Sequence, residues 1–168
     1  MKYSAITALP LFMLLVVCGL ASPAYGGDKN PYFKRPHLFG LFIGETRVPV
    51  AGAADETADT VGLEYEFRAS KTWGAGLSVE RTDDAFGGQG SGLWAVSLFY
   101  HPTPNWRFGV GRGKEKVYSS PSHTEPLTRF SIAYDFHFGG MGIAPTYAMD
   151  RINGEKVRVI GLTLTKPF

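Results

Sequence analysis

Apolar and polar residues alternate with a period of two through most of this chain, and this alternation limits the possible folds more than any other feature. In the segment Thr60–Arg68, for example, one face carries Val61, Leu63, Tyr65 and Phe67, and the other carries Gly62, Glu64, Glu66 and Arg68. Successive side chains of a β-strand point to opposite faces. The alternation therefore predicts half-buried strands, and no segment shows the period of an amphipathic helix that would cover them.

Eight segments carry this pattern, and stretches rich in Gly, Pro, Asn or Asp separate them. Strands are expected at His37–Thr46, Thr60–Arg68, Trp73–Arg81, Gly92–His101, Trp106–Gly113, Thr128–Phe138, Met141–Met149 and Lys156–Phe168. The predicted fold class is all-β.

A soluble sandwich with one solvated face would alternate in the same way, but three observations favour a membrane barrel. The segments are near nine to eleven residues long, as a tilted strand needs to cross a bilayer, and their number is even. The connections also alternate in length, like the short periplasmic turns and longer extracellular loops of bacterial barrels. Long connections are expected at Arg47–Asp59, Thr82–Ser91 and Lys114–Leu127, a moderate one at Asp150–Glu155, and short ones at Ala69–Thr72, Pro102–Asn105 and Gly139–Gly140.

Large aromatic residues gather where the apolar faces meet the short turns. They are Trp73, Tyr100, Trp106, Phe136, Phe138 and the terminal Phe168. Amphipathic rings at a bilayer boundary have one dry and one wet side, so this placement is typical of an aromatic girdle. The alternative is that the rings form the core of a soluble protein. The girdle is favoured because the residues cluster at one end of their strands.

The N-terminus has the layout of a secretory signal peptide. Met1 and Lys2 give a positive start, Ala8–Leu20 is almost wholly apolar, and Ala24 and Gly26 are small residues at the −3 and −1 positions of a cleavage site. The apolar run is too short to be a convincing membrane-spanning helix. We therefore expect a signal peptide at residues 1–26, a short extension at 27–36 and an eight-stranded antiparallel up-and-down transmembrane β-barrel at 37–168.

Cys18 is the only cysteine of the chain and lies within this signal. One interpretation is that it is removed with the signal peptide. The other is that it is a lipid-acceptor cysteine, because Leu15 stands at the leading position of such a site. In both cases the mature chain forms no internal disulfide.

The mature chain resembles the small eight-stranded outer-membrane proteins, the group that includes the OmpA transmembrane domain, OmpX and OmpW-like proteins. The resemblance spans about Pro36–Phe168 and rests on architecture and on the C-terminal pattern, in which Leu162 and Leu164 alternate with small residues before the final Phe168. It implies location in the cell outer membrane, contact with outer-membrane lipid and lipopolysaccharide, and recognition of the C-terminal signal by the barrel-assembly machinery.

An eight-stranded barrel has an interior that side chains just fill, so charged residues on the polar faces would be enclosed. These are Glu64, Glu66, Arg68, Glu80, Arg107, Arg129, Asp135 and His137. Buried charges need partners, and the main expectation is an internal ion-pair network in which Arg107 or Arg129 neutralises Glu64 and Glu66. The functional alternative is an ion or proton path, or a gate that opens when the pairs rearrange.

Motifs for catalysis or cofactors are weak. Asp135 and His137 share a face, but the His-x-Ser arrangement of a lipid A deacylase is missing, and Ser119, Ser120, Ser122 and His123 are more simply part of a solvated loop. The glycine-rich stretches precede no helix that could bind a phosphate. We expect no cofactor, no metal site and, at a formal net charge of +2, no nucleic-acid partner.

The polar connections, among them Ala51–Ala58 and Asp83–Gly90, could bind an extracellular ligand. Arg112, Lys114 and Lys116 either contact lipopolysaccharide phosphates or form an ordinary charged rim. The expected function is that of a non-enzymatic outer-membrane protein with a structural or surface-interaction role in the cell envelope. The alternatives are a narrow channel for small solutes or ions and a lipid A-modifying enzyme.

Overall fold

The computed structural model describes residues 35–50, 52–84 and 88–168. The predicted signal peptide, with Cys18, lies outside these residues. The described strands are β1 (His37–Val48), β2 (Glu56–Arg68), β3 (Trp73–Thr82), β4 (Ser91–Tyr100), β5 (Trp106–Val117), β6 (His123–Tyr134), β7 (Phe136–Phe138), β8 (Met141–Ile152) and β9 (Glu155–Pro167).

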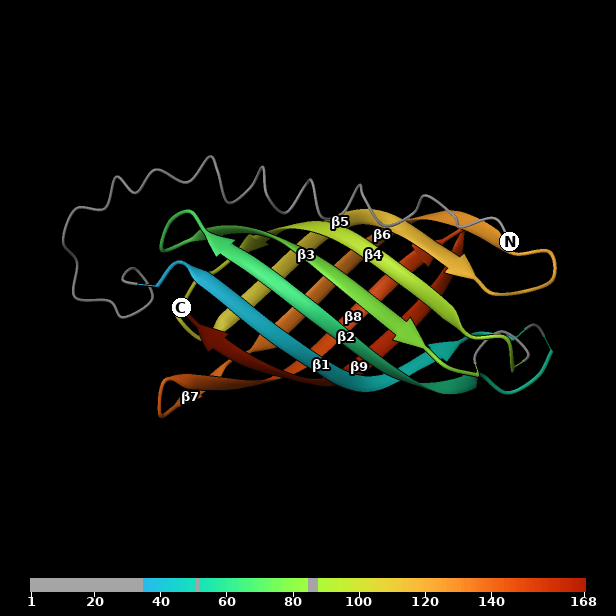
Figure 1. Ribbon diagram of the computed structural model, residues 1–168, viewed down its shortest axis with the longest axis horizontal. Helices are drawn as coiled ribbons and strands as arrows, with labels where there is room; N and C mark the ends of the chain where they lie inside the picture. The colour runs from blue at the N-terminus through green and yellow to red at the C-terminus, as the bar shows by residue number, and fades with distance from the viewer. Residues whose placement is uncertain (1–34, 51, 85–87) are drawn as a thin grey trace, which may run out of the picture.

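The strands form one closed antiparallel barrel in which each strand pairs with its neighbours in sequence (Figure 1). Pairing of β1 with β9 closes the ring. β6 and β7 are two parts of one long strand, since both pair with β8 in the same register, which is interrupted at Tyr134 and Asp135. On the other side of this strand, Asp135 N donates to Asn105 O at 2.7 Å, next to the first residue of β5. The predicted eight-stranded up-and-down barrel is therefore confirmed.

Small residues at the β1–β9 junction allow the barrel to close tightly. Gly44 and Gly161 are partners across this junction, and each faces the other strand so closely that an added Cβ would lie 2.3 Å from a backbone carbonyl oxygen. A side chain at either position would push the two strands apart, so glycine is required by the close backbone approach.

The outer wall of the barrel is apolar. Leu63 and Val96, two residues predicted to face outward, are 49% and 40% exposed. Such a surface is suited to lipid tails, because hydrocarbon solvates it without the cost that water would impose. The predicted alternation of outward apolar and inward polar residues is confirmed on these strands.

The aromatic residues gather at the short-turn end of the wall. Trp73 packs against Tyr100 with ring centroids 5.1 Å apart, and Tyr134 packs edge-on against Trp106 at 4.9 Å and against Phe136 at 4.8 Å. The C-terminus lies at the same end (Figure 1). This band of paired rings has the position expected of an aromatic girdle.

The strands at the other end are longer than the sequence predicts, and the connections are correspondingly shorter. The expected loop Arg47–Asp59 reduces to residues 49–55, and Lys114–Leu127 reduces to residues 118–122. The reason is that the outward residues here are charged or polar rather than apolar. A strand whose outer face leaves the hydrocarbon loses the apolar alternation and resembles a loop in sequence.

Among the described residues, no helix has both the length and the apolar character needed to cross a membrane.

Candidate functional site

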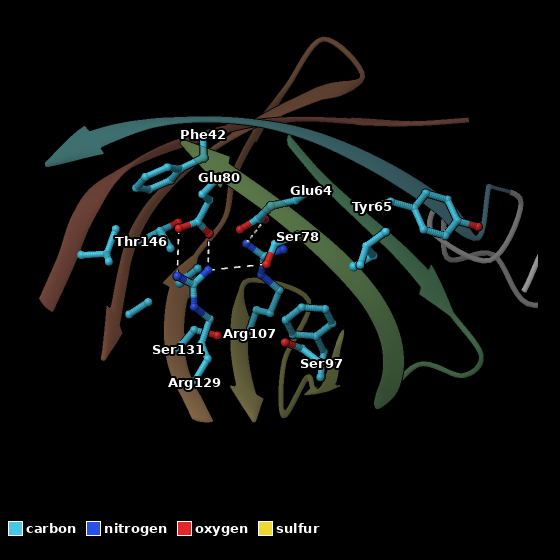
Figure 2. Close-up of a pocket in the computed structure, with 15 residues that line it drawn as sticks. Phe42, Glu64, Tyr65, Ser78, Glu80, Ser97, Arg107, Arg129, Ser131 and Thr146 are labelled. Carbon is cyan, nitrogen blue, oxygen red and sulfur yellow. Dashed lines mark hydrogen bonds and ion pairs between the residues drawn. The ribbon is translucent and has the colours of Figure 1, made fainter. Parts of the chain in front are cut away.

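The inner wall carries buried charges in two clusters, each built around a guanidinium group, and we take this interior as the candidate site. The Arg129 cluster consists of Arg129 on β6, Glu80 on β3 and Asp150 on β8. Arg129 and Asp150 are direct partners across adjacent strands, whereas Glu80 lies on the opposite wall. Figure 2 shows the Arg129 side chain extending across the interior to Glu80.

Arg129 binds both carboxylates of its cluster through several donors at once. Its Nε donates to Asp150 Oδ1 at 2.7 Å, and its Nη2 donates to Asp150 Oδ2 at 2.6 Å and to Glu80 Oε2 at 2.8 Å. Arg129 Nη1 contacts Glu80 Oε1. All three side chains are buried. A planar guanidinium suits this role because its fork of donors matches two carboxylates in fixed geometry.

The Arg107 cluster lies nearer the short-turn end and consists of Arg107, Glu64, Glu66, Arg68, His101 and Asp135. Arg107 Nη2 donates to Glu64 Oε2 at 3.0 Å, and its Nη1 lies 3.6 Å from Glu66 Oε2. The same guanidinium lies 5.2 Å from the ring centre of Phe99, a cation–π contact.

The rest of the Arg107 cluster converges on Glu66. Its Oε1 lies 2.6 Å from His101 Nε2 and accepts a hydrogen bond from Arg68 Nε at 3.3 Å. Arg68 in turn lies 4.0 Å from the Asp135 carboxylate. In the described part of the chain, the buried atoms of this cluster that have no hydrogen-bond partner include Glu66 Oε2, His101 Nδ1 and both carboxylate oxygens of Asp135.

Glu115 adds a further carboxylate to the interior. It is buried on β5 and accepts a hydrogen bond from Ser91 Oγ on β4 at 2.8 Å. Within the described residues, the ion pairs that the structure shows do not include Glu115. The hydroxyl group is therefore its direct partner, and Arg129 supplies positive charge only from a distance.

An apolar layer closes the end of the interior that is remote from the C-terminus. It consists of Val48, Ala58, Leu93, Ala95, Leu127, Ile152 and Val157, which are buried and in mutual contact. It lies directly beside the Arg129 cluster, since Leu127 and Ile152 are the next inward residues after Arg129 and Asp150 on their strands. Three hydroxyl groups border it, with Thr60 bonded to Thr46 at 2.6 Å and to Thr82 at 2.9 Å.

A small cavity lies in the interior between the two charged clusters. Its volume is about 20 Å³, and it is bordered by Phe42, Ser78, Phe99 and both guanidinium groups (Figure 2). This space has room for about one water molecule. In the described residues, no group of three or more metal-ligating side chains comes together. The arrangement holds the charged groups in fixed positions.

The structure places most of the predicted interior residues in these clusters. Glu64, Glu66, Arg68, Glu80, Arg107, Arg129 and Asp135 all face inward and are buried or half-buried. Of the two partners considered for Glu64 and Glu66, the structure shows Arg107, while Arg129 binds Glu80 and Asp150. His137 follows Asp135 in the inward phase but is exposed on β7, because alternation predicts the facing of a residue but not where the enclosed interior ends.

Sequence reasoning missed three interior groups, His101, Glu115 and Asp150. All three continue an inward phase already visible in the sequence: Glu115 follows Arg107 on β5 and Asp150 follows Gly142 on β8 at even spacing. Extending each strand along its inward phase would have found them. Of the predicted assembly signal, Leu162 and Leu164 face outward, and the Phe168 ring lies 5.8 Å from His37.

The architecture defines the class: the chain has the fold of the transmembrane β-barrels of outer membranes. More particularly, it shares the fold of small eight-stranded members. Ail, the attachment invasion locus protein of Yersinia pestis, superimposes with a TM-score of 0.56 at 17% identity, covering 79% of this chain and 97% of Ail. The N-terminal barrel domain of Pseudomonas aeruginosa OprF gives 0.59 at 13% identity, covering 80% and 98%.

Neisserial surface protein A gives a TM-score of 0.58 at 7% identity, covering 79% of this chain and 97% of that protein. Neither a model of a known family nor a curated protein sequence matches the chain. Identities this low establish a common fold, whereas function has to be argued from the interior and the surface of this chain.

Proposed function

We propose that the chain is a non-enzymatic bacterial outer-membrane protein that has a structural role in the cell envelope and does not conduct solutes. The observation that supports this most directly is the filled interior. The apolar layer at one end and the two ion-paired clusters below it leave a cavity of about 20 Å³. A solute would have to displace Leu127 and Ile152 and then separate Arg129 from its carboxylates.

Separating these ion pairs is costly. Removing one partner of a buried pair typically costs about 3–5 kcal/mol, because the remaining charge is left without compensation. Arg129 binds two carboxylates at once. A conducting state that separated Arg129 from them would leave both carboxylates without a cation in an apolar surrounding. This arrangement favours a rigid wall over a gate.

Ser119, in the loop before β6, and His123, the first residue of β6, resemble a catalytic pair in sequence but do not have the required geometry. Ser119 Oγ donates its hydrogen to Pro121 O at 2.7 Å, and His123 Nδ1 lies 3.1 Å from Ser119 Oγ. With its proton engaged elsewhere, the hydroxyl can only accept from the imidazole. A general base must instead take that proton, so the observed bonds argue against an activated nucleophile.

The short connections favour a structural role over recognition by loops. The four links at the end remote from the C-terminus span residues 49–55, 83–90, 118–122 and 153–154. Such links leave little chain from which to build a binding surface, whereas the wall of the barrel offers a large one.

Conductance in planar lipid bilayers tests the proposal. The full chain, inserted after folding in detergent, is expected to give no steady unit steps. The matched control is Arg129→Ser, which shortens the side chain that crosses the interior. The proposal would be contradicted if the unmodified protein gave unit conductance steps and the Arg129→Ser variant gave steps of a different size. Such a result would mean that ions pass through the interior of the barrel.

A further inference from the structure

The outer wall of β5 changes from apolar to charged at a defined level. The outward residues of this strand are Trp106, Phe108 and Val110, followed by Arg112, Lys114 and Lys116. On a membrane barrel such a change marks the edge of the hydrocarbon. The three cations therefore lie at the level of the lipid headgroups, at the end of the barrel remote from the C-terminus.

Three other cations of the outer wall have carboxylate partners. Arg47 pairs with Glu45, Arg81 with Asp83, and Arg158 with Asp55. In contrast, Arg112, Lys114 and Lys116 form no ion pair with any carboxylate in the described part of the chain. Their charge is available to an external anion.

Two aromatic rings border the three cations. Trp94 is the direct partner of Lys114 across the β4–β5 pair and is 40% exposed. Tyr118 is 46% exposed, and its hydroxyl lies so close over Gly92 that a Cβ there would be 2.3 Å away. Its ring centre lies 5.9 Å from Lys116 Nζ and 5.6 Å from the Arg81 guanidinium. The Tyr118 ring therefore forms cation–π contacts with Lys116 and Arg81.

The positive surface continues around the barrel from β5. Arg112 pairs in register with Thr128, Thr128 with Arg151, and Arg151 with Lys156. At the β1–β2 pair the wall instead presents two neighbouring acids, Glu45 and Asp59. The unpaired positive charge is thus confined to one sector of the circumference.

We propose that Arg112, Lys114 and Lys116, together with Trp94 and Tyr118, form a binding site for the phosphate groups of the outer-leaflet glycolipid, lipopolysaccharide. This inference rests on the proposed function, since it requires that the barrel spans the outer membrane. Cations at the hydrocarbon edge attract anionic headgroups. Arginine binds phosphate through paired donors, and lysine binds it as a point charge.

The position of the site favours a lipid over a soluble anion. The outward residues directly below the cations, Val110 on β5 and Val96 on β4, are apolar and exposed. A ligand with phosphate groups above and acyl chains below matches both parts of this surface at once. Inorganic phosphate or a soluble polyanion would use only the upper part.

Titration with lipid A tests the site. The full chain, folded in a zwitterionic detergent, is mixed with lipid A that carries both phosphates or with lipid A from which they have been removed, and Kd is read from tryptophan fluorescence. The test variant is R112Q/K114Q/K116Q. Each cation near an anionic membrane surface contributes about fivefold in affinity. Because the triple variant lacks three such cations, its Kd for lipid A is expected to rise by roughly a hundredfold.

The matched control is R47Q/R158Q, which removes two cations of the same wall that already have carboxylate partners, and its Kd is expected to stay unchanged. Equal binding of phosphate-free lipid A, an unchanged Kd for the triple variant, or displacement by millimolar inorganic phosphate would each overturn the assignment. Displacement by a soluble polyanion such as heparin at lower concentration than lipid A would do the same.

Two further measurements keep the outcomes separate. The heat-dependent shift in gel mobility of each variant shows that the barrel is folded, and Lys114→Gln alone replaces the triple variant if that variant does not fold. A protein that inserts into vesicles without conducting but does not bind lipid A would contradict only the phosphate site. A protein that fails to insert would contradict the proposed function itself.

Discussion

Arg129 on the inner wall and Arg158 on the outer wall each pair with an aspartate, but the two pairs have different surroundings. The side chains of Arg129 and Asp150 are 6% and 1% exposed, whereas those of Arg158 and Asp55 are 48% and 39% exposed. Bulk water stabilises the separated charges of the outer pair, whereas the inner pair is almost fully shielded from bulk water. The same chemistry therefore holds the interior together and contributes little outside.

The comparison extends to the apolar residues of the two walls. Leu127 is buried in the apolar layer, whereas Leu63 faces outward. Protein atoms pack around the first, and lipid tails are expected to surround the second. The interior thus depends on fixed complementarity, while the outer wall depends on apolar character alone.

The largest effect is expected for Arg129→Leu, which leaves Glu80 and Asp150 buried without their cation. The free energy of unfolding should fall by about 3–5 kcal/mol, the usual cost of breaking a buried pair. Urea unfolding of the protein in phosphatidylcholine vesicles, followed by tryptophan fluorescence, measures this change. The triple variant R129L/E80L/D150L serves as a control, because it removes the orphaned charges and should recover much of the loss. Equal destabilisation by both variants would show that packing, rather than charge, is responsible.

A somewhat smaller effect is expected for Leu127→Ala, which creates a cavity in the apolar layer. The free energy of unfolding should fall by about 2–4 kcal/mol, as for other buried leucines. Leu63→Ala is the matched change on the outer wall, and its effect should be smaller because mobile lipid tails can fill the space. The comparison between walls would fail if the two substitutions proved equally destabilising in the same vesicles.

The hydroxyl groups of the interior should contribute less than the ion pairs. Thr60→Val removes the central member of the group Thr46, Thr60 and Thr82, at a cost of about 1 kcal/mol. The cost is limited because Thr46 and Thr82 lie 3.4 Å apart and can still bond to each other. Thr57→Val, on the exposed face of the same strand, is the control and should change stability little. A loss as large as that of Arg129→Leu would show that the group acts as part of the charged network.

The facing of most residues followed from the sequence because each strand has strict alternation with a lipid-facing side. Glu80, Arg107 and Arg129 could be placed in the interior on this basis alone. The partners could not be chosen, because a guanidinium crosses the barrel and the residue that it meets depends on register and strand tilt. Arg129, for instance, meets Asp150 on the adjacent strand and Glu80 on the opposite wall.

Strand ends were predicted less well than strand centres, for a physical reason. Above the hydrocarbon edge the outer face changes to residues such as Arg47 and Lys114, and the apolar half of the pattern disappears. The inner face still alternates there, with Thr46 and Val48 buried, but small inward residues give a weak signal. Asp150 was assigned to a connection for this reason, and the Arg129 cluster therefore lacked one of its members in the sequence analysis.

The smallest effect is expected for Arg158→Leu, the outer counterpart of Arg129→Leu. Exposed ion pairs typically contribute less than about 1 kcal/mol, so the free energy of unfolding should change by no more than that amount, and any change should shrink as salt is added. The measurement is urea unfolding in the same vesicles at low and high salt. A loss approaching that of Arg129→Leu would mean that Arg158 and Asp55 are shielded from water in the membrane. In that case, the difference between the two walls would arise from the lipid headgroups as well as from the protein.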